Sequence, residues 1–397
     1  MYDGHRDRRY TPRRGVVCRG SNSTAEVLVS QIRVFCITTL LLLGLPSLLA
    51  AAGSSTPAPS VGSYFEGPDS TAVDSIGASG QGLSEALQDV PPFTMRIGAR
   101  LQVRHRYETE GQTHLTRVQR GRLSFSGQVY EDFEYLIQLE LAGPGVRLFD
   151  ASVRYQLHPG AVLWAGQGKA PFGRQQLTSS GALHFVDRSI VDVRFAPGRQ
   201  QGVGVGGMLA GERLQYQAGV FNGNGINQTQ NPGGRMMPVG RLVFTPLGAF
   251  PPEESAHVGD SSPRVALGVA GLTNREVVDG IEVDVSRVGS EAAFRTGGLN
   301  MTAEFFREWA EPTDGERTVT DGGHGQIGYL WDFRHEVVAR YALIRPELER
   351  NSVETGIAYS YYVAGHRAKL QADIRNLRSG VTGEDEMEFR VQFTLAL

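Results

Sequence analysis

Residues 389–397 read FRVQFTLAL, with an apolar residue at every second position up to the last. Arg390, Gln392 and Thr394 fill the positions between, so the stretch predicts a β-strand with one apolar and one polar face. A chain that ends in such a strand suggests that the strand closes a sheet, because no sheet edge can stay unpaired in lipid. The stretch therefore points to a closed β-barrel of the outer-membrane type.

The same two-residue period recurs from about residue 95 onward. The alternating segments are roughly ten residues long, the length that crosses a bilayer at a tilt. They predict an all-β fold, a transmembrane antiparallel β-barrel of about 16 strands. A soluble β-sandwich also alternates in this way, but aromatic residues near the expected strand ends favour an interfacial girdle. The expected strands begin near residues 96, 115, 132, 148, 161, 201, 213, 236, 263, 290, 299, 324, 335, 352, 366 and 386, and the girdle residues are Tyr107, Tyr130, Phe221, Trp309, Tyr329, Trp331, Tyr361 and Tyr362.

Composition agrees with many short strands. The 397 residues include 50 Gly and 19 Pro, and the mean hydropathy of -0.23 excludes a bundle of apolar membrane helices. One segment differs, since residues 34–52 are almost wholly apolar, follow Arg33 and end in three alanines. This is the pattern of a signal peptide, with an N-terminal membrane anchor as the alternative.

Three regions follow from these patterns. Residues 1–53 are expected to be a leader with a signal peptide, residues 54–93 a flexible periplasmic segment rich in Ser, Gly and Pro, and residues 94–397 the outer-membrane barrel. Both cysteines, Cys18 and Cys36, lie in the leader, so no disulfide is expected in the exported chain.

Charge argues against nucleic acid as a partner. The first 53 residues hold seven of the 39 basic residues and three of the 42 acidic ones, so the exported part has a net charge of -7. Only two of its basic residues are lysines, Lys169 and Lys369. Arginine suits bidentate recognition of phosphate and carboxylate, although a GC-rich genome would produce the same bias.

The alternation lapses between Gly168 and Gly202. A loop of this length in a compact fold is usually functional, and in a barrel of 16 strands the lumen is wide enough for a loop to fold inward and narrow it. Basic residues there would concentrate anions. An ordinary surface loop is the alternative. The stretch contains Lys169, Arg174, Arg188, Arg194 and Arg199.

Six blocks of sequence, in this order, resemble the phosphate-selective porin O/P family. They are VQRGRLSFSGQVYEDFEYLIQLELAG (118–143), LFDASVRYQL (148–157), GQGKAPFGRQQLTSS (166–180), FVDRS (185–189), FAPGRQQGVGVGG (195–207) and AGVFNGNG (218–225). The resemblance implies a trimeric outer-membrane barrel of 16 strands with an inward constriction loop and a ladder of Arg and Lys that draws anions through.

The resemblance also assigns roles within the constriction. Phosphate-selective members carry a basic residue just ahead of a Thr-Ser-Ser run and an acid in the preceding strand. Here the run is matched at residues 178–180, and Asp150 takes the acidic position. Gln176 stands where the family has a lysine, and Arg174 is the nearest substitute.

The predicted function is therefore a passive outer-membrane channel for small solutes, biased toward anions, with phosphate or polyphosphate as candidates. An unselective diffusion porin and a non-conducting scaffold or adhesin are the alternatives. Expected partners are small anions, outer-membrane lipid and two further copies of the chain. The expected constriction residues are Asp150, Lys169, Arg174, Gln176, Ser179, Ser180, Arg188, Arg194 and Arg199, and strand parity places Arg100, Arg104, Arg122, Arg154 and Lys369 in a lumen ladder.

No enzymatic or cofactor chemistry is expected. The histidines after the leader are scattered without metal-ligand spacing. The glycines of residues 202–207 resemble a nucleotide-binding loop but are not followed by a helical pattern. A hydrolytic pair of Ser180 and His184 is a remote alternative.

Overall fold

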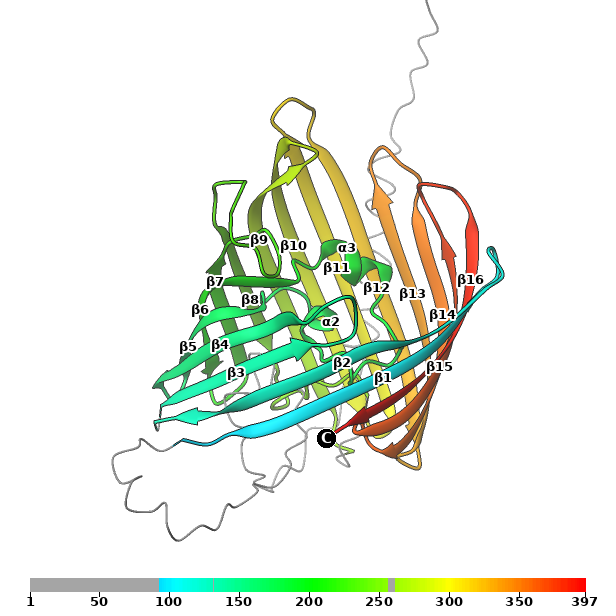
Figure 1. Ribbon diagram of the computed structural model, residues 1–397, viewed down its shortest axis with the longest axis horizontal. Helices are drawn as coiled ribbons and strands as arrows, with labels where there is room; N and C mark the ends of the chain where they lie inside the picture. The colour runs from blue at the N-terminus through cyan, green and yellow to red at the C-terminus, as the bar shows by residue number, and fades with distance from the viewer. Residues whose placement is uncertain (1–92, 131, 256–260) are drawn as a thin grey trace, which may run out of the picture. The chain divides into compact units, whose positions relative to one another are not determined.

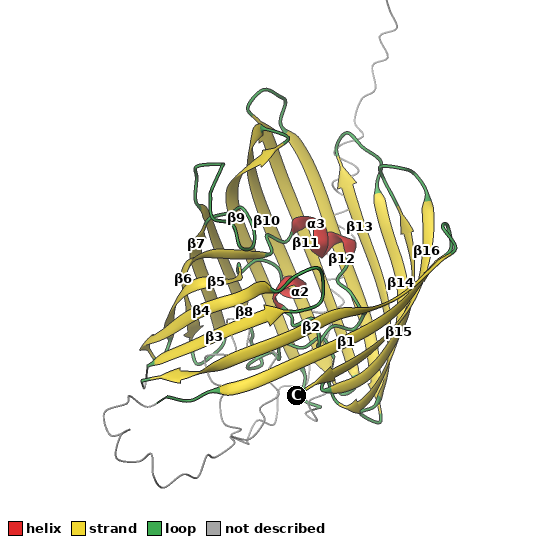
Figure 2. Cartoon of the chain, viewed as in Figure 1, coloured by secondary structure: helices red, strands yellow, loops and turns green. Residues whose placement is uncertain are grey.

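The computed structural model describes residues 93–130, 132–255 and 261–397, so the predicted leader and nearly all of the predicted periplasmic segment lie outside the described residues. Sixteen antiparallel strands form one closed barrel, in which each strand pairs with its neighbours in sequence and β1 pairs with β16 (Figures 1 and 2). The strands are β1 (Arg96–Glu108), β2 (Thr113–Val129), β3 (Phe133–Glu140), β4 (Arg147–His158), β5 (Ala161–Lys169), β6 (Arg199–Leu209), β7 (Leu214–Phe221), β8 (Met237–Phe244), β9 (Arg264–Val278), β10 (Ile281–Thr296), β11 (Leu299–Pro312), β12 (Thr318–Trp331), β13 (His335–Pro346), β14 (Ser352–Ala364), β15 (Ala368–Arg378) and β16 (Asp385–Ala396).

The C-terminal strand closes the barrel, as its sequence predicts. Leu395 of β16 lies opposite Leu101 of β1. On β16 the polar Gln392 and Thr394 have no exposed surface, whereas the apolar Val391 and Phe393 are 46% and 44% exposed. A soluble fold would bury the apolar face instead, so this wall is built to face lipid on the outside.

Two predicted strand starts are wrong. β10 begins at Ile281 and β12 at Thr318, each several residues before the expected positions. β10 starts early because Asp279 and Gly280 both have positive φ, 52° and 83°, and form the tight hairpin turn that an Asp-Gly pair favours. An Asp-Gly pair before an alternating segment is the sequence signal for this turn.

Two of the expected girdle aromatics are not on the lipid face. Phe221 is 2% exposed and packs against Trp164 in the interior, and Tyr362 is 1% exposed. Tyr329 and Trp331 do lie on the outside, at 56% and 38% exposure. The prediction rested on position near a strand end, which does not fix the face. Successive side chains alternate between the two faces, so such an aromatic residue can point to either one.

The two rims of the barrel differ in their connections. The rim that holds the end of β16 carries the short connection between β2 and β3 and short turns at 159–160, 210–213, 297–298, 332–334 and 365–367. The opposite rim carries most of the longer loops, including residues 170–198 and 222–236. One connection breaks this rule, since the long loop 245–263 emerges at the short-turn rim. No helix in the part of the chain that the structure describes is long and apolar enough to cross a membrane.

The glycine-rich stretch 202–207 lies within β6, which confirms that it is a strand and not a nucleotide loop. A Cβ atom on Gly207 would lie 1.9 Å from the carbonyl oxygen of Gly160, and one on Gly202 would lie 2.4 Å from that of Val220. Neighbouring backbone therefore approaches too closely for any side chain at these two positions.

Candidate functional site

Residues 170–198, here called the constriction loop, connect β5 to β6 and lie inside the barrel (Figure 1). The loop contains two short helices, α2 (Arg174–Leu177) and α3 (Ile190–Phe195), and α3 contacts β12 and β13 of the wall. Phe172 and Phe195 have no exposed surface, and their rings lie 5.5 Å and 5.6 Å from the ring of Phe306 on β11. Burial of these rings holds the loop against one side of the lumen, as an inward-folded loop requires.

Carboxylates of the wall hold the loop by its backbone. Glu304 on β11 accepts hydrogen bonds from the backbone N–H groups of Arg174 (2.5 Å) and Gln175 (2.8 Å), at the start of α2. Glu354 on β14 accepts one from Ile190 (2.8 Å), at the start of α3. These bonds satisfy N–H groups that have no partner within their own helices.

A third carboxylate acts in the same way. Asp373 on β15 accepts a hydrogen bond from the backbone N–H of Val186 (3.1 Å), in the stretch between the helices. The same carboxylate accepts from Nε and Nη2 of Arg390 on β16, at 2.6 Å and 2.9 Å. Attachment of the loop is thus tied to the ion pairs of the wall.

Basic side chains of the predicted ladder also hold the loop, by donating hydrogen bonds to its oxygen atoms. Arg100 donates to the Ser179 hydroxyl (2.9 Å), and Lys369 donates to the carbonyl oxygen of Leu183 (3.1 Å). Arg104 donates to the carbonyl oxygen of Val186 (2.7 Å). These three side chains point into the lumen and serve at least partly to position the loop.

The other two ladder residues lie farther from the loop contacts. The Nε atom of Arg122 is 3.1 Å from a carboxylate oxygen of Glu140, and Arg154 is 4.0 Å from Glu134. Arg154 is 7% exposed, whereas Arg122 is half-buried. Both face the interior of the barrel.

Two basic residues of the loop region lie within hydrogen-bonding distance of backbone carbonyl oxygens of the loop. Lys169 Nζ lies 3.3 Å from the carbonyl oxygens of Leu177 and Thr178, at the C-terminal end of α2. Arg188 donates to the carbonyl oxygens of Gln175 (3.0 Å), Gln176 (3.2 Å) and Thr178 (2.6 Å). Both cations lie where helix carbonyls without internal partners concentrate negative potential.

The remaining predicted constriction cations have partners in other segments. Arg194 pairs with Glu308 of β11 at 2.5 Å, and Arg199 pairs through Nε and Nη2 with Asp150 of β4 at 2.9 Å and 3.1 Å. Arg174 is buried and donates to the carbonyl oxygen of Pro251 at 2.9 Å. Most of the charge that the sequence offers here is therefore balanced locally.

The hydroxyl and amide groups of the predicted site are also brought to the lumen. Gln176 and Ser180 are 7% and 3% exposed. Ser180 Oγ has no hydrogen-bond partner among the described residues. The remote Ser180–His184 pair is not formed, because the two ring nitrogens of His184 lie 3.5 Å from Glu254 and 3.4 Å from Glu336.

Two carboxyl groups of the loop have shifted acidities. Burial opposes ionisation of Asp187, but Arg104 and Arg120 outweigh it and hold the pKa of Asp187 well below its ordinary value. Burial raises the pKa of Asp192 to about 6, although Arg188 and Lys169 partly offset it. Asp187 is therefore ionised at any pH near neutral, and Asp192 takes up a proton in mildly acidic solution.

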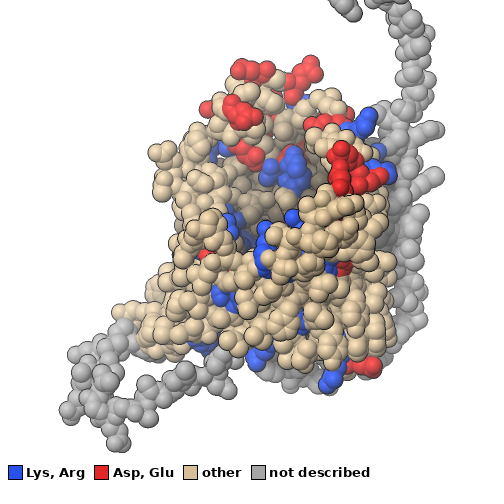
Figure 3. Space-filling view, turned by 45° about the vertical axis from the view of Figure 1, so that its right-hand side comes forward, with Lys and Arg blue, Asp and Glu red and all other residues tan. Residues whose placement is uncertain are grey.

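The long-loop side of the constriction holds a small recess of about 60 Å³, here called the vestibule recess. It lies between β1, β2, β15 and β16 and the loop residue Asp187. Five arginines and two carboxylates converge on it, and Figure 3 shows basic atoms inside the mouth of the barrel with acidic residues on the rim. The lining residues are Arg104, Arg106, Leu115, Arg117, Asp187, Arg375, Glu388 and Arg390.

Sequence reasoning found Arg104 of this recess and missed the other four arginines. Arg390 alternates with the apolar residues of β16, so its orientation was readable. Arg117 was not, because the register of β2 against β1 shifts between Gln102 and Val103. The bulge turns Arg117 toward the lumen although Arg120 and Arg122, of opposite parity, also point inward.

Comparison with solved structures shows the porin fold. The anion-selective porin of Comamonas acidovorans aligns with a TM-score of 0.60 at 12% identity, over 77% of this chain and 100% of that one. OmpT of Vibrio cholerae in its trimer form aligns with a TM-score of 0.54 at 11% identity, over 77% and 99% of the two chains. The outer membrane channel DcaP of Acinetobacter baumannii aligns with a TM-score of 0.52 at 12% identity, over 76% and 97%.

No curated protein matches the chain in sequence. The sequence profile of the phosphate-selective porin O and P family matches residues 93–383, which is most of the chain and nearly all of the barrel. Together with the closed barrel of 16 strands and its inward loop, this match confirms the resemblance that the sequence blocks suggested, and the chain belongs to the phosphate-selective porin O and P family of outer-membrane channels.

Proposed function

We propose that this outer-membrane porin conducts small anions in preference to cations and holds oxyanions of the phosphate or polyphosphate type at the vestibule recess. The observation that carries the proposal is the convergence of five arginines and two carboxylates on one recess of the lumen. Elsewhere in the described constriction most cations have a carboxylate or a set of carbonyl groups as partner. Four of the five recess arginines are also paired with carboxylates, so the positive charge left in excess there is that of Arg117, and a low-dielectric wall focuses its field on passing ions.

Among the recess arginines, Arg117 offers the most N–H groups for hydrogen bonds to a ligand. Its Nε donates to Gln119 at 2.7 Å, and its two Nη atoms have no partner among the described residues. The other four arginines each hold a carboxylate. A guanidinium with free N–H groups can bind an oxyanion through two parallel charge-assisted bonds.

Planar bilayer recording tests the proposal. In a KCl gradient the reversal potential is expected to show anion preference, and added phosphate is expected to reduce the chloride current. Arg117→Ala should raise the phosphate concentration for half-block by about tenfold, because it removes one charge-assisted contact. Arg317→Ala, at an exposed position of the 313–317 loop, is the matched control and should leave both values unchanged. A cation-biased reversal potential would contradict the proposal.

An unselective diffusion porin is the second candidate. The observation that favours it is the local neutralisation of the lumen charges, since Arg194, Arg199 and Arg287 each face a carboxylate within 2.9 Å. A reversal potential near zero with no effect of phosphate would establish this function instead. Absence of current steps would favour a non-conducting scaffold.

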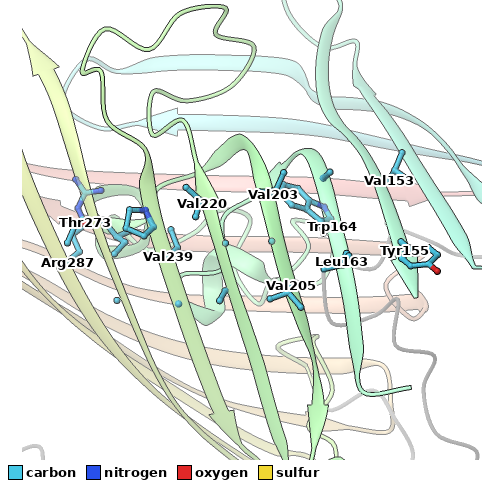
Figure 4. Close-up of a pocket in the computed structure, with 18 of the residues that line it drawn as sticks. Val153, Tyr155, Leu163, Trp164, Val203, Val205, Val220, Val239, Thr273 and Arg287 are labelled. Carbon is cyan, nitrogen blue, oxygen red and sulfur yellow. The ribbon is translucent and has the colours of Figure 1, made fainter. Parts of the chain in front are cut away.

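We further propose a homotrimer that assembles through the outer face of β4 to β10. This face carries a hollow of about 1120 Å³ lined by small and branched apolar residues (Figure 4). It includes several of the shortest strands of the barrel, β5 to β8. Small residues let the walls of neighbouring barrels approach closely, and OmpT of V. cholerae, which has the same fold, is described in a trimer form. Members of the lining are Ala165, Val203, Gly204, Val205, Ala218, Gly219, Val220 and Gly240.

Val203→Arg is expected to convert the trimer to monomers. Val203 is 57% exposed on β6 and lines the hollow, so a guanidinium there would lie in the contact without a partner. Ile357→Arg on β14, where the residue is 62% exposed, carries the same cost of facing lipid and is the control. Mass measurement in detergent distinguishes the two. If both variants or neither become monomeric, another face makes the contact or lipid fills the hollow.

A further inference from the structure

A second segment, which enters the barrel from the short-turn rim, contacts the constriction loop inside the lumen. Residues 250–255, here called the opposing segment, belong to the loop between β8 and β9, the one long connection at the short-turn rim. Pro251 and Pro252 accept hydrogen bonds through their carbonyl oxygens from Arg174 (2.9 Å) and Thr178 (3.1 Å) of the constriction loop. The two loops therefore meet inside the lumen although they start at opposite ends of the barrel.

Glu254 makes the densest contacts between the two loops. Its carboxylate accepts hydrogen bonds from the backbone N–H of His184 (2.7 Å) and from Nε2 of Gln175 (2.9 Å), and its own backbone N–H donates to the carbonyl oxygen of Ala182 (3.1 Å). All three partners belong to the constriction loop. They come from two parts of it, since Gln175 lies in α2 and the other two lie between the helices.

Burial makes these contacts obligatory. Glu254 is 4% exposed and His184 is 1% exposed. A carboxylate buried this deeply is strongly unfavourable unless its oxygens are hydrogen-bonded. Burial would raise the pKa of Glu254, but His184 and Gln175 outweigh it and hold the pKa below its ordinary value. Displacement of the constriction loop would leave this charge without its partners, so the positions of the two loops are coupled.

The contact is also anchored to the wall. The second ring nitrogen of His184 lies 3.4 Å from Glu336 of β13, which accepts hydrogen bonds from Asn300 (2.9 Å) and Tyr362 (2.5 Å). On the other side, Arg295 of β10 donates to the carbonyl oxygen of Glu253 at 2.6 Å. The opposing segment and the loop are thus held together and fixed to strands on separate parts of the barrel.

The Phe250 ring completes the anchor. It packs against the buried Val243, Ala266 and Ala293, which belong to β8, β9 and β10. The guanidinium of Arg174 lies 4.4 Å from the centre of the same ring. A cation placed over an aromatic face in this way adds a contact between the loop and the segment.

From these contacts we infer that the opposing segment is a latch that sets the position of the constriction loop, and that Glu254 is the positioning residue through which it acts. The width of the channel then depends on two loops, one from each rim, and not on the constriction loop alone. Only the conductance test of this inference depends on the proposed channel function, because the contact between the loops can also be measured without current.

The test compares Glu254→Ala, Glu254→Gln and Glu253→Ala. Loss of two hydrogen bonds to a charged group is expected to increase the population of detached loop about tenfold or more in Glu254→Ala. Glu254→Gln keeps one acceptor oxygen and should show a smaller change. Glu253→Ala removes the same charge from the neighbouring residue but keeps the backbone carbonyl that Arg295 uses, so it is the matched control.

Two measurements read the position of the loop. In bilayers, Glu254→Ala should raise single-channel conductance and open-channel noise, whereas Glu253→Ala should match the wild type. In detergent, Ala182→Cys, with Cys18 and Cys36 replaced by Ser, should react with a water-soluble thiol reagent about tenfold faster when Glu254 is Ala. The buried position of Ala182, 8% exposed, keeps that reaction slow in the latched state.

Electrophoretic mobility without boiling confirms that each variant is folded before the comparison. Unchanged conductance, noise and labelling in folded Glu254→Ala would overturn the latch. A cation-biased wild type would contradict the proposed anion selectivity yet leave the ratio between variants interpretable. If the wild type carried no current, the labelling ratio alone would decide.

Discussion

Asp187→Asn is expected to make the channel about tenfold more selective for anions over cations. The Asp187 carboxylate lies in the vestibule recess, where it pairs with Arg104, lies 3.0 Å from Arg120 and lies 3.7 Å from Arg390. Its pKa is held well below the ordinary value, so the wild-type residue is fully charged at neutral pH. Removal of a unit charge a few ångströms from a passing ion changes its energy by about 1.4 kcal/mol or more, which corresponds to that factor.

Reversal potentials at two ionic strengths measure this change. The shift should shrink in high salt, because mobile ions screen charges that are open to water. Asp314→Asn, on the exposed 313–317 loop, removes the same charge outside the recess and should have little effect. Equal selectivity in wild type and Asp187→Asn would show that the recess does not lie on the ion path.

Glu354→Ala is expected to lower the thermal stability of the barrel and to open the channel. Glu354 and Arg340 form an ion pair on adjacent strands, and neither side chain has any exposed surface. Arg340 also donates to the carbonyl oxygen of Asp187 (3.0 Å), while Glu354 holds the backbone N–H of Ile190 at the start of α3. Truncation of one partner leaves a buried charge alone, at a cost of about 3–5 kcal/mol.

The temperature at which the folded band disappears in unboiled electrophoresis measures the first effect, and single-channel conductance measures the second. The double variant Arg340→Met/Glu354→Leu separates the two causes. It removes both charges, so most of the stability should return, since an apolar pair can replace a buried ion pair at little cost. The Ile190 contact stays lost, so the conductance should remain raised. A single variant with wild-type stability and conductance would contradict this account of α3.

The sequence specified the wall of the barrel well. In β16 the alternation of Arg390, Gln392 and Thr394 with apolar residues was enough to assign the inner and outer faces. The reason is local, because successive side chains of a strand point to opposite faces whatever the rest of the chain does. The same logic located the constriction loop as the place where alternation fails.

The partners of the lumen charges could not be predicted in the same way. Arg104 and Asp187 are 83 residues apart in sequence, and Glu254 and His184 are 70 apart. Their contacts depend on closure of the barrel and on how far each loop reaches into it. Even parity fails where the register shifts, as it does between Val118 and Arg120, next to Arg117.

By itself, the sequence predicted a barrel of about 16 strands with a lipid-facing exterior and a polar lumen, and it marked one basic loop that the family resemblance placed inside. Only the tertiary structure decided that most of the basic side chains hold the loop in place, that five arginines meet at the vestibule recess, and that a second loop enters from the opposite rim. Alternation is a property of neighbouring residues, whereas charge balance in a lumen is set by residues that closure of the barrel brings together from distant parts of the chain.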